Sequence, residues 1–305
     1  MGDIRVGTSS WADRSLLASG WYPRSVNTAA GRLAYYAERF DLVEVDTSYY
    51  AVPAVETTAA WVERTPPGFT FDVKAFSLFT GHPTPVDALP RDLRPARHTG
   101  RLRRRDLPED AYDELWARFH AALDPLATAG RLGAVLLQFP PWLRYGEAAK
   151  RRITELARRC QPHRVAVEFR HSSWLTGTDG VDTIDFLRRH ELSYTCVDMP
   201  QGHPSSIPPI LVATAELAMV RFHGHSADWV EGGKEDKFRY AYSDAELGEW
   251  VGPLGELAEQ ADEVHVLLNN CCGGQAQRDA QRLAELLGEP LCAPVGADRR
   301  RAGVG

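Results

Sequence analysis

The sequence predicts a single α/β barrel of eight parallel strands surrounded by helices, and two observations support this fold class. Short segments rich in β-branched and aromatic residues alternate with amphipathic helical segments along nearly the whole chain. Long helical connections of this kind are typical of parallel strand pairing. The strand segments number eight, and eight parallel strands close into a TIM-like barrel, which we therefore favour over an open doubly wound sheet.

The expected strands are short, mostly apolar runs bounded by turn signals. In chain order they are residues 4–8, 42–46, 69–74, 132–139, 165–168, 193–198, 218–222 and 264–268. The helices show apolar residues three and four positions apart, as in Val181, Ile184 and Leu187. They cover residues 30–40, 55–64, 109–129, 147–160, 181–190, 244–260 and 275–287. Residues 202–215, rich in Pro and Ser, connect two strands without a helical pattern.

Residues 1–288 are expected to form one domain, because no linker divides them. A long segment, residues 76–108, is inserted after the third strand. Residues 289–305 are expected to form a flexible basic tail. The composition, 44% hydrophobic and 25% charged, is that of an ordinary globular protein. The net charge of −6 argues against a wholly basic nucleic-acid-binding protein but leaves room for a local basic patch.

The chain is expected to be cytoplasmic and not to bind a membrane. Its first residues, which include Asp3 and Arg5, have no apolar signal-peptide core. No run of about 18 apolar residues occurs that would span a bilayer. The five cysteines are an odd number, and Cys271 and Cys272 are adjacent, which does not suit a secreted disulfide framework.

Polar residues alternate with apolar ones in the strands and gather at the carboxyl ends. Because the helix-facing side of a barrel must be apolar, the polar side chains are expected to point inward. The inward set is Glu44, Asp46, Glu168, Asp198, Lys74, Arg170 and Arg221. His223 and Asn269 follow the last two strands in the same phase. TIM-barrel enzymes have their sites at this end, so the sequence predicts the site there.

Seven short motifs stand at the strand ends. In chain order they are VGTSSW at 6–11, EVDTSY at 44–49, FDVKA at 71–75, LQFPP at 137–141, EFRHSSW at 168–174, VRFHG at 220–224 and the pair of Asn269 and Asn270. Together they resemble the YecE-like family, and the match runs from about Gly7 to Leu287. The resemblance implies a TIM barrel with its site at these motifs. The family is one of unknown function, so the resemblance implies no reaction.

The chain departs from the pattern of that family at two places. Cys271 and Cys272 follow the asparagine pair where His is common, and His225 stands where Arg is common. With nearby carboxylates these residues make a metal cluster conceivable, but their spacing matches no metal-binding signature. We therefore predict no metal ligands, and the sequence specifies no cofactor.

Glu168 is the predicted general base, because a carboxylate close to an arginine is held ionised and ready to accept a proton. The predicted catalytic residues are Glu168, Asp46, Asp198 and His223. The predicted substrate-binding residues are Lys74, Arg170, Arg221, Asn269, Trp11, Tyr49, Gln138 and Trp174. On this hypothesis Glu168→Gln abolishes turnover and leaves the fold intact. The alternative is that the inner charges form a buried ion-pair network that only fills the barrel mouth.

Between Arg91 and Arg105 the inserted segment contains seven arginines and one acidic residue, Asp92. Charge alone favours a solvated, mobile segment, but its position also suits an arm that attracts phosphates. The predicted function is that of a hydrolase or lyase acting on a phosphate-bearing or nucleic-acid substrate. The alternative is a non-catalytic nucleic-acid-binding or adaptor barrel, in which this segment makes the contacts and the inner charges are structural.

Overall fold

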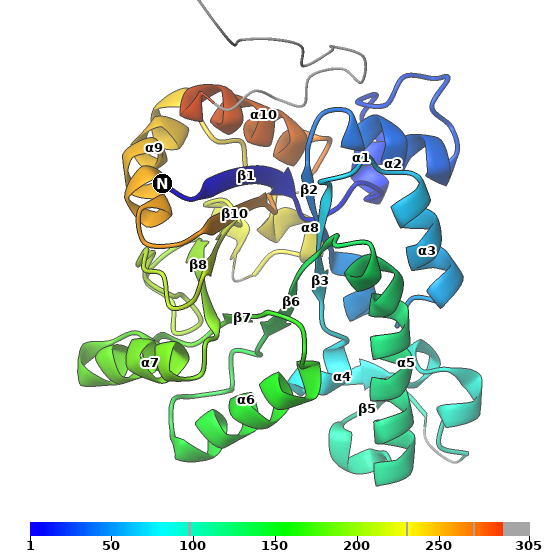
Figure 1. Cartoon of the computed structure of the whole chain (residues 1–305). Coiled ribbons are helices and arrows are strands. Elements are labelled where there is room, and N and C mark those ends of the chain that lie inside the picture. Colours follow the sequence, from blue (N-terminus) through cyan, green and yellow to red (C-terminus); the bar gives the residue numbers. More distant parts are fainter. Residues whose placement is uncertain (97–98, 230, 271, 289–305) are drawn as a thin grey trace, which may run out of the picture.

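The computed structural model describes residues 1–96, 99–229, 231–270 and 272–288, and within them eight strands close into a barrel (Figure 1). In order around the barrel the strands are β1 (Asp3–Thr8), β10 (Glu263–Leu268), β9 (Leu217–Phe222), β8 (Ser193–Asp198), β7 (Val165–Glu168), β6 (Leu132–Gln138), β3 (Thr70–Lys74) and β2 (Leu42–Val45). Neighbouring barrel strands are parallel throughout. The predicted fold class is confirmed.

Helices surround the barrel and connect its strands. The longer ones are α2 (Ala29–Ala37), α3 (Val55–Glu63), α5 (Glu109–Thr128), α6 (Glu147–Cys160), α7 (Gly177–Arg189), α9 (Asp244–Ala258) and α10 (Gln275–Leu287). The short helices α1 (Arg14–Ala18), α4 (Ser77–Thr80) and α8 (Lys234–Lys237) follow β1, β3 and β9. Residues 199–216 connect β8 to β9 without a helix, as expected. In the parts of the chain that the structure describes, no helix combines the length and apolarity needed to cross a membrane.

Helix α7 begins at Gly177, four residues before the predicted start. Because glycine disfavours helix, the sequence pattern did not predict the first turn of α7, which contains Gly177 and Gly180. In the structure, a Cβ atom on Gly180 would lie 2.9 Å from the carbonyl carbon of Leu175. The first turn therefore packs so closely on the preceding residues that only glycine fits, and this tertiary contact overrides helix propensity.

The barrel interior combines an apolar cluster with buried charged side chains. Its apolar cluster consists of Leu42, Ala134, Leu136, Ala166, Leu217, Met219 and Leu267. On three strands the residue two positions after a member of this cluster is charged and fully buried, namely Glu44, Glu168 and Arg221. Because strand side chains alternate with a period of two, these charges share the inward face. The barrel interior therefore contains an apolar cluster, a buried Asp72–His265 pair with His265 Nδ1 and Asp72 Oδ2 2.8 Å apart, and a group of charges at the carboxyl end.

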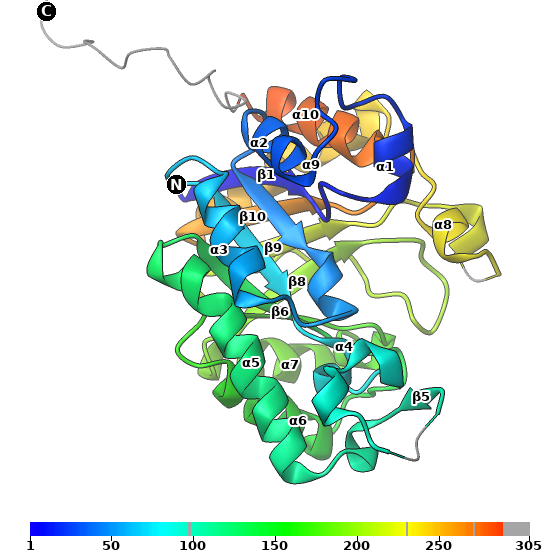
Figure 2. The same cartoon turned by 90° about the vertical axis from the view of Figure 1, so that its right-hand side faces the viewer.

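The inserted segment, residues 76–108, is ordered and packed in its described part. It contains α4 and the antiparallel pair β4 (Thr84–Pro85) and β5 (Arg101–Leu102). Phe79 is buried and stacks on Trp116 of α5 with ring centroids 3.8 Å apart. In Figure 2, α4 and β5 lie on the side toward which the strands point, as do α1 and α8.

The described part of the segment therefore packs against the rest of the protein, although Arg91, Arg103 and Arg105 are exposed to solvent as expected. Leu89 and Leu102, both within the segment, are buried. Arg94 donates to the carbonyl oxygens of Asp87 and Leu89, and Arg101 donates to that of Pro83. Because the segment is highly charged, the sequence pattern did not indicate that a few apolar residues anchor it. The predicted basic tail, residues 289–305, lies outside the described residues.

We predict that Phe79→Ala lowers the free energy of unfolding by about 3 kcal/mol, because it removes a buried ring that packs on Trp116. Arg105→Ala, an exposed change in the same segment, should alter it by no more than about 0.5 kcal/mol. Urea denaturation followed by circular dichroism measures both. Equal, small effects of the two substitutions would mean that the segment is not anchored by its apolar residues.

Candidate functional site

Arg221 lies at the centre of the charged barrel mouth and is fully buried. Its Nε and Nη2 donate to the two carboxylate oxygens of Glu44 at 2.8 and 2.7 Å, and its Nη1 donates to Glu168. The planar guanidinium suits this arrangement because its N–H groups form a rigid fork that matches carboxylate geometry. Arg221 thus connects β2, β7 and β9 across the barrel.

Glu168 is shared between two arginines. Its second carboxylate oxygen accepts a hydrogen bond from Nε of Arg170 at 2.5 Å. Burial alone would raise the pKa of Glu168, but Arg170 and Arg221 hold it well below its usual range. Glu168 has no exposed surface, and both of its oxygens are engaged. Glu168 therefore holds Arg170 in place and has no oxygen left to face the open end of the barrel.

His223 completes the support of Arg170. Its Nε2 is 2.9 Å from Nη2 of Arg170, and its Nδ1 is 2.9 Å from the side-chain amide of Asn269. The atom of Asn269 that faces Nδ1 is the side-chain nitrogen, and Nε2 also lies 3.5 Å from a carboxylate oxygen of Glu168. Burial, assisted by Arg170, lowers the pKa of His223 to about 3. The ring is therefore neutral at neutral pH.

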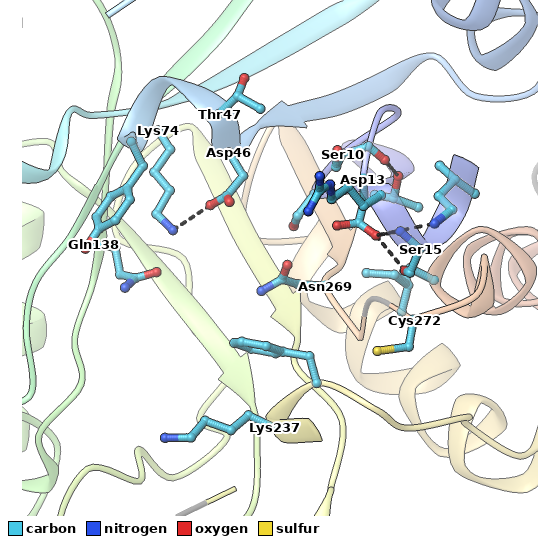
Figure 3. A pocket seen from close by; sticks show the side chains of 18 of the residues that line it. Ser10, Asp13, Ser15, Asp46, Thr47, Lys74, Gln138, Lys237, Asn269 and Cys272 are labelled. Carbon is cyan, nitrogen blue, oxygen red and sulfur yellow. Dashed lines mark hydrogen bonds and ion pairs between the residues drawn. The ribbon is translucent and has the colours of Figure 1, made fainter. Parts of the chain in front are cut away.

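A cavity of about 740 Å³ opens at the carboxyl ends of the strands (Figure 3). Asp46, Lys74, Gln138 and Asn269 line it, from positions at or just after the ends of four strands. Lys74 Nζ donates to Asp46 Oδ1 at 2.7 Å and lies 4.6 Å from the centre of the Tyr49 ring. The volume is that of a typical small-molecule site.

The cavity wall carries more cations than carboxylates. The cationic side chains are Arg14, Lys74, Arg170 and Lys237, and the carboxylates are Asp13 and Asp46. Asp13 accepts hydrogen bonds from the backbone and hydroxyl of Ser15 at the start of α1, which partly satisfies it. An excess of positive charge in a concave, partly enclosed site attracts anions. The cavity therefore suits an anionic ligand.

Asp198 faces the helices and not the barrel interior, so the prediction of an inward Asp198 is wrong. In the register of β8 and β9, Val197 is the partner of the inward Arg221, which turns the next residue outward. Asp198 accepts a hydrogen bond from the Tyr242 hydroxyl at 2.5 Å and lies 2.8 Å from Nε2 of His225. Those polar partners on the helix side make burial of a carboxylate there tolerable.

Trp11 and Trp174 are not among the residues that line the cavity. Trp174 is fully buried, stacks on Phe169 with ring centroids 4.2 Å apart, and donates to the carbonyl oxygen of Leu143 at 2.7 Å. Trp11 packs edge-on against Trp61 at 5.3 Å. Both rings belong to the hydrophobic core, so the prediction that Trp11 and Trp174 contact the substrate is wrong. Tyr49 and Gln138, which were predicted with them, do line the cavity.

Sequence reasoning missed several cavity residues that loops and helices contribute, among them Ser9, Ser10, Thr47, Lys237 and Gln277. The first three lie within two residues of the end of β1 or β2. A position just after a strand could have identified them as cavity residues from the sequence. Lys237 and Gln277 lie in α8 and α10, which reach the cavity only through tertiary packing. No local pattern indicates such a placement.

In the described parts of the chain, no group of three or more His, Cys, Asp or Glu side chains is placed to hold a metal ion. Cys272 lines the cavity, whereas His225 is bonded to Asp198 on the helix side. Cys271 lies outside the described residues. The two departures from the family pattern therefore occupy different environments.

Residues 5–300 match a family described as proteins of unknown function, DUF72. The chain belongs to the DUF72 family. The UPF0759 protein YunF of Bacillus subtilis (strain 168) is 32% identical over 296 residues, which cover 93% of this chain and 94% of YunF. At the level of this family, the resemblance carried by the strand-end motifs is supported.

Solved DUF72 structures share the barrel. A DUF72 protein of Enterococcus faecalis V583 aligns with a TM-score of 0.78 at 24% identity, covering 94% of this chain and 96% of that one. A DUF72 protein of Thermotoga maritima MSB8 aligns with a TM-score of 0.74 at 27% identity, covering 94% of this chain and 100% of that one. The similarity establishes the family and the fold, so the reaction has to be inferred from the site.

We predict that Glu168→Gln lowers the free energy of unfolding by about 3–5 kcal/mol, because it leaves Arg170 and Arg221 short of a buried negative charge. This revises the sequence-based expectation that the variant keeps its fold intact. Asp46→Asn, in a partly exposed ion pair, should cost about 1 kcal/mol or less. Thermal and urea denaturation of the two variants measure the difference. Wild-type stability of Glu168→Gln would show that the arginines do not depend on this carboxylate.

The two histidines that follow β9 should titrate differently. With its pKa near 3, His223 stays neutral between pH 5 and 8, whereas the hydrogen bond to Asp198 raises the pKa of His225. The His225 pair therefore stabilises the fold fully below the ordinary histidine pKa of about 6.5, and this contribution is lost as pH rises through the raised value. For His223 the sign is opposite, and stability is lost as pH falls below about 6.5.

Nitrogen NMR of the imidazole rings across this pH range distinguishes the two residues. Asp198→Asn should return the pKa of His225 toward its ordinary value and leave His223 unchanged. A His223 ring that titrates near pH 6.5 would contradict its assignment as a dry, neutral support of Arg170.

Proposed function

We propose that the protein is a hydrolase or lyase that acts on a phosphate-bearing substrate bound in the cavity. The observation that carries this proposal is that Lys74, paired with Asp46, and Arg170 both line a cavity wall with more cations than carboxylates. Ammonium and guanidinium groups only donate hydrogen bonds and are the usual partners of phosphate oxygens. Both cations are held in place, Lys74 by Asp46 and Arg170 by Glu168 and His223.

Asp46 is assigned the role of proton acceptor. Its side chain is 24% exposed and lines the cavity, so water or a substrate can reach it. It would take a proton from an attacking water in hydrolysis, or from a substrate carbon in a lyase reaction. Lys74, which donates to Asp46, is assigned the role of proton donor to the leaving group. Glu168, the base suggested by the sequence, is assigned a positioning role, because arginines engage both of its oxygens.

Binding and turnover test these roles separately. Lys74→Met should weaken the binding of inorganic phosphate at least tenfold in isothermal titration calorimetry, while Asp46→Asn leaves it measurable. With a mixed panel of sugar phosphates, nucleotides and phosphodiesters, followed by phosphorus NMR, Asp46→Asn should lower turnover by about 100-fold or more. Arg158→Met, which removes an exposed cation outside the cavity wall, is the control. Phosphate binding that does not depend on Lys74 would overturn the proposal.

The alternative function is a non-catalytic nucleic-acid-binding or adaptor barrel. Exposure of Arg91, Arg103 and Arg105 in the inserted segment favours it. It predicts salt-sensitive nucleic-acid binding that is lost when these arginines are replaced and that is unaffected by Asp46→Asn. Phosphate binding without turnover of any compound in the panel would favour this alternative.

A further inference from the structure

Four aromatic rings form a continuous row that begins in the cavity wall and extends beyond it. We call these four residues the aromatic row, which consists of Tyr50, Tyr49, His82 and Trp142. Tyr49 and Tyr50 line the cavity. Successive ring centroids in the row lie 5.1, 5.3 and 5.9 Å apart. The row therefore leads from the cavity, over the start of the inserted segment, to the loop after β6.

The two ends of the row are exposed. Trp142 is 54% exposed and Tyr50 is 46% exposed, although large aromatic side chains usually cover apolar surface. Neighbouring rings in the row meet edge to face, at interplanar angles from 67° to 81°. The rings therefore do not stack on one another. Exposed ring surface is offered by Trp142 and Tyr50 at the two ends of the row, whereas Tyr49 and His82 between them are partly buried.

Two cationic side chains, those of Lys74 and Arg152, lie beside the row. Lys74 lies over the ring of Tyr49, the second ring of the row, in the cavity wall. Further out, the guanidinium of Arg152 on α6 lies against Gly81, where an added Cβ atom would come within 2.3 Å of Nη2. It is thus next to His82, and no carboxylate of the described residues lies within ion-pair distance of it. Burial, together with the nearby cations, lowers the pKa of His82 to about 4, so that ring is uncharged at neutral pH.

We infer that the aromatic row binds the bases of a short single-stranded oligonucleotide whose terminal phosphate occupies the cavity. Aromatic side chains stack on any base, and arginine or lysine beside them holds the backbone. Lys74 and Arg152 lie at separate points along the row, which suits successive phosphates of a strand rather than one isolated phosphate. The inference rests on the proposed function, because it uses the same phosphate position, and it adds the class of substrate.

Chain-length dependence of binding tests the inference. The ligands are ribose 5-phosphate and 5′-phosphorylated deoxyadenylates of one, two and four nucleotides, titrated by calorimetry. Affinity should rise by at least about fivefold for each base that stacks on the row. Trp142→Leu should abolish the gain at four nucleotides and leave binding of the mononucleotide unchanged. Trp142→Phe, the matched control, should keep most of the gain because it retains an aromatic face.

The outcomes separate this inference from the proposed function. Equal affinity for ribose 5-phosphate and the tetranucleotide, or a length-dependent gain that survives Trp142→Leu, overturns the aromatic row as a base-binding site and leaves the proposed function standing. Mononucleotide binding that is unchanged in Lys74→Met overturns the proposed function and the inference together. A length-dependent gain lost in Trp142→Leu, with mononucleotide binding lost in Lys74→Met, supports both.

Discussion

The rest of the site depends on one constraint, which is that a guanidinium enclosed in a barrel has to be paired. Arg221 has no exposed surface, and an unpaired charge there would cost several kcal/mol. Glu44 and Glu168 supply the pairing from two other strands. Because the donor fork is rigid, their carboxylates must lie where its N–H groups point. The relative placement of β2, β7 and β9 at the barrel mouth follows from that geometry.

The same constraint separates the charges that are enclosed in the ion-pair network from those that reach the cavity. Arg221 donates hydrogen bonds to both oxygens of Glu44 and to one oxygen of Glu168, so these groups are largely engaged with each other. A second group, Asp46 and Lys74, lies in the cavity wall where ligands can reach it. The structural interpretation therefore describes Glu44, Glu168 and Arg221, and the catalytic hypothesis stays a proposal for Asp46 and Lys74. A rigid lower layer also restricts the motion of the upper one, and such preorganisation is what electrostatic stabilisation of a reacting group requires.

The inserted segment joins the scaffold and the candidate site. Phe79 anchors α4 on Trp116 of α5. Three residues later, His82 contacts both Tyr49 at the cavity and the exposed Trp142. A buried apolar contact on one side thus determines where a polar ring lies on the other. The exposed arginines of the segment have a defined position for the same reason, because the backbone that carries them is packed.

The sequence by itself determined the barrel, the end at which charges gather and most of the residues there, because strand periodicity and strand count are local properties. It could not determine which face a fully buried strand turns inward, since both faces of β8 are enclosed, and Asp198 was misplaced as a result. Nor could it show that the arginine near Glu168 in sequence engages that carboxylate fully, whereas Asp46 stays accessible. Only the tertiary structure decided that Arg170 and Arg221 enclose Glu168 and leave Asp46 at the cavity, because exposure depends on neighbours contributed by distant strands.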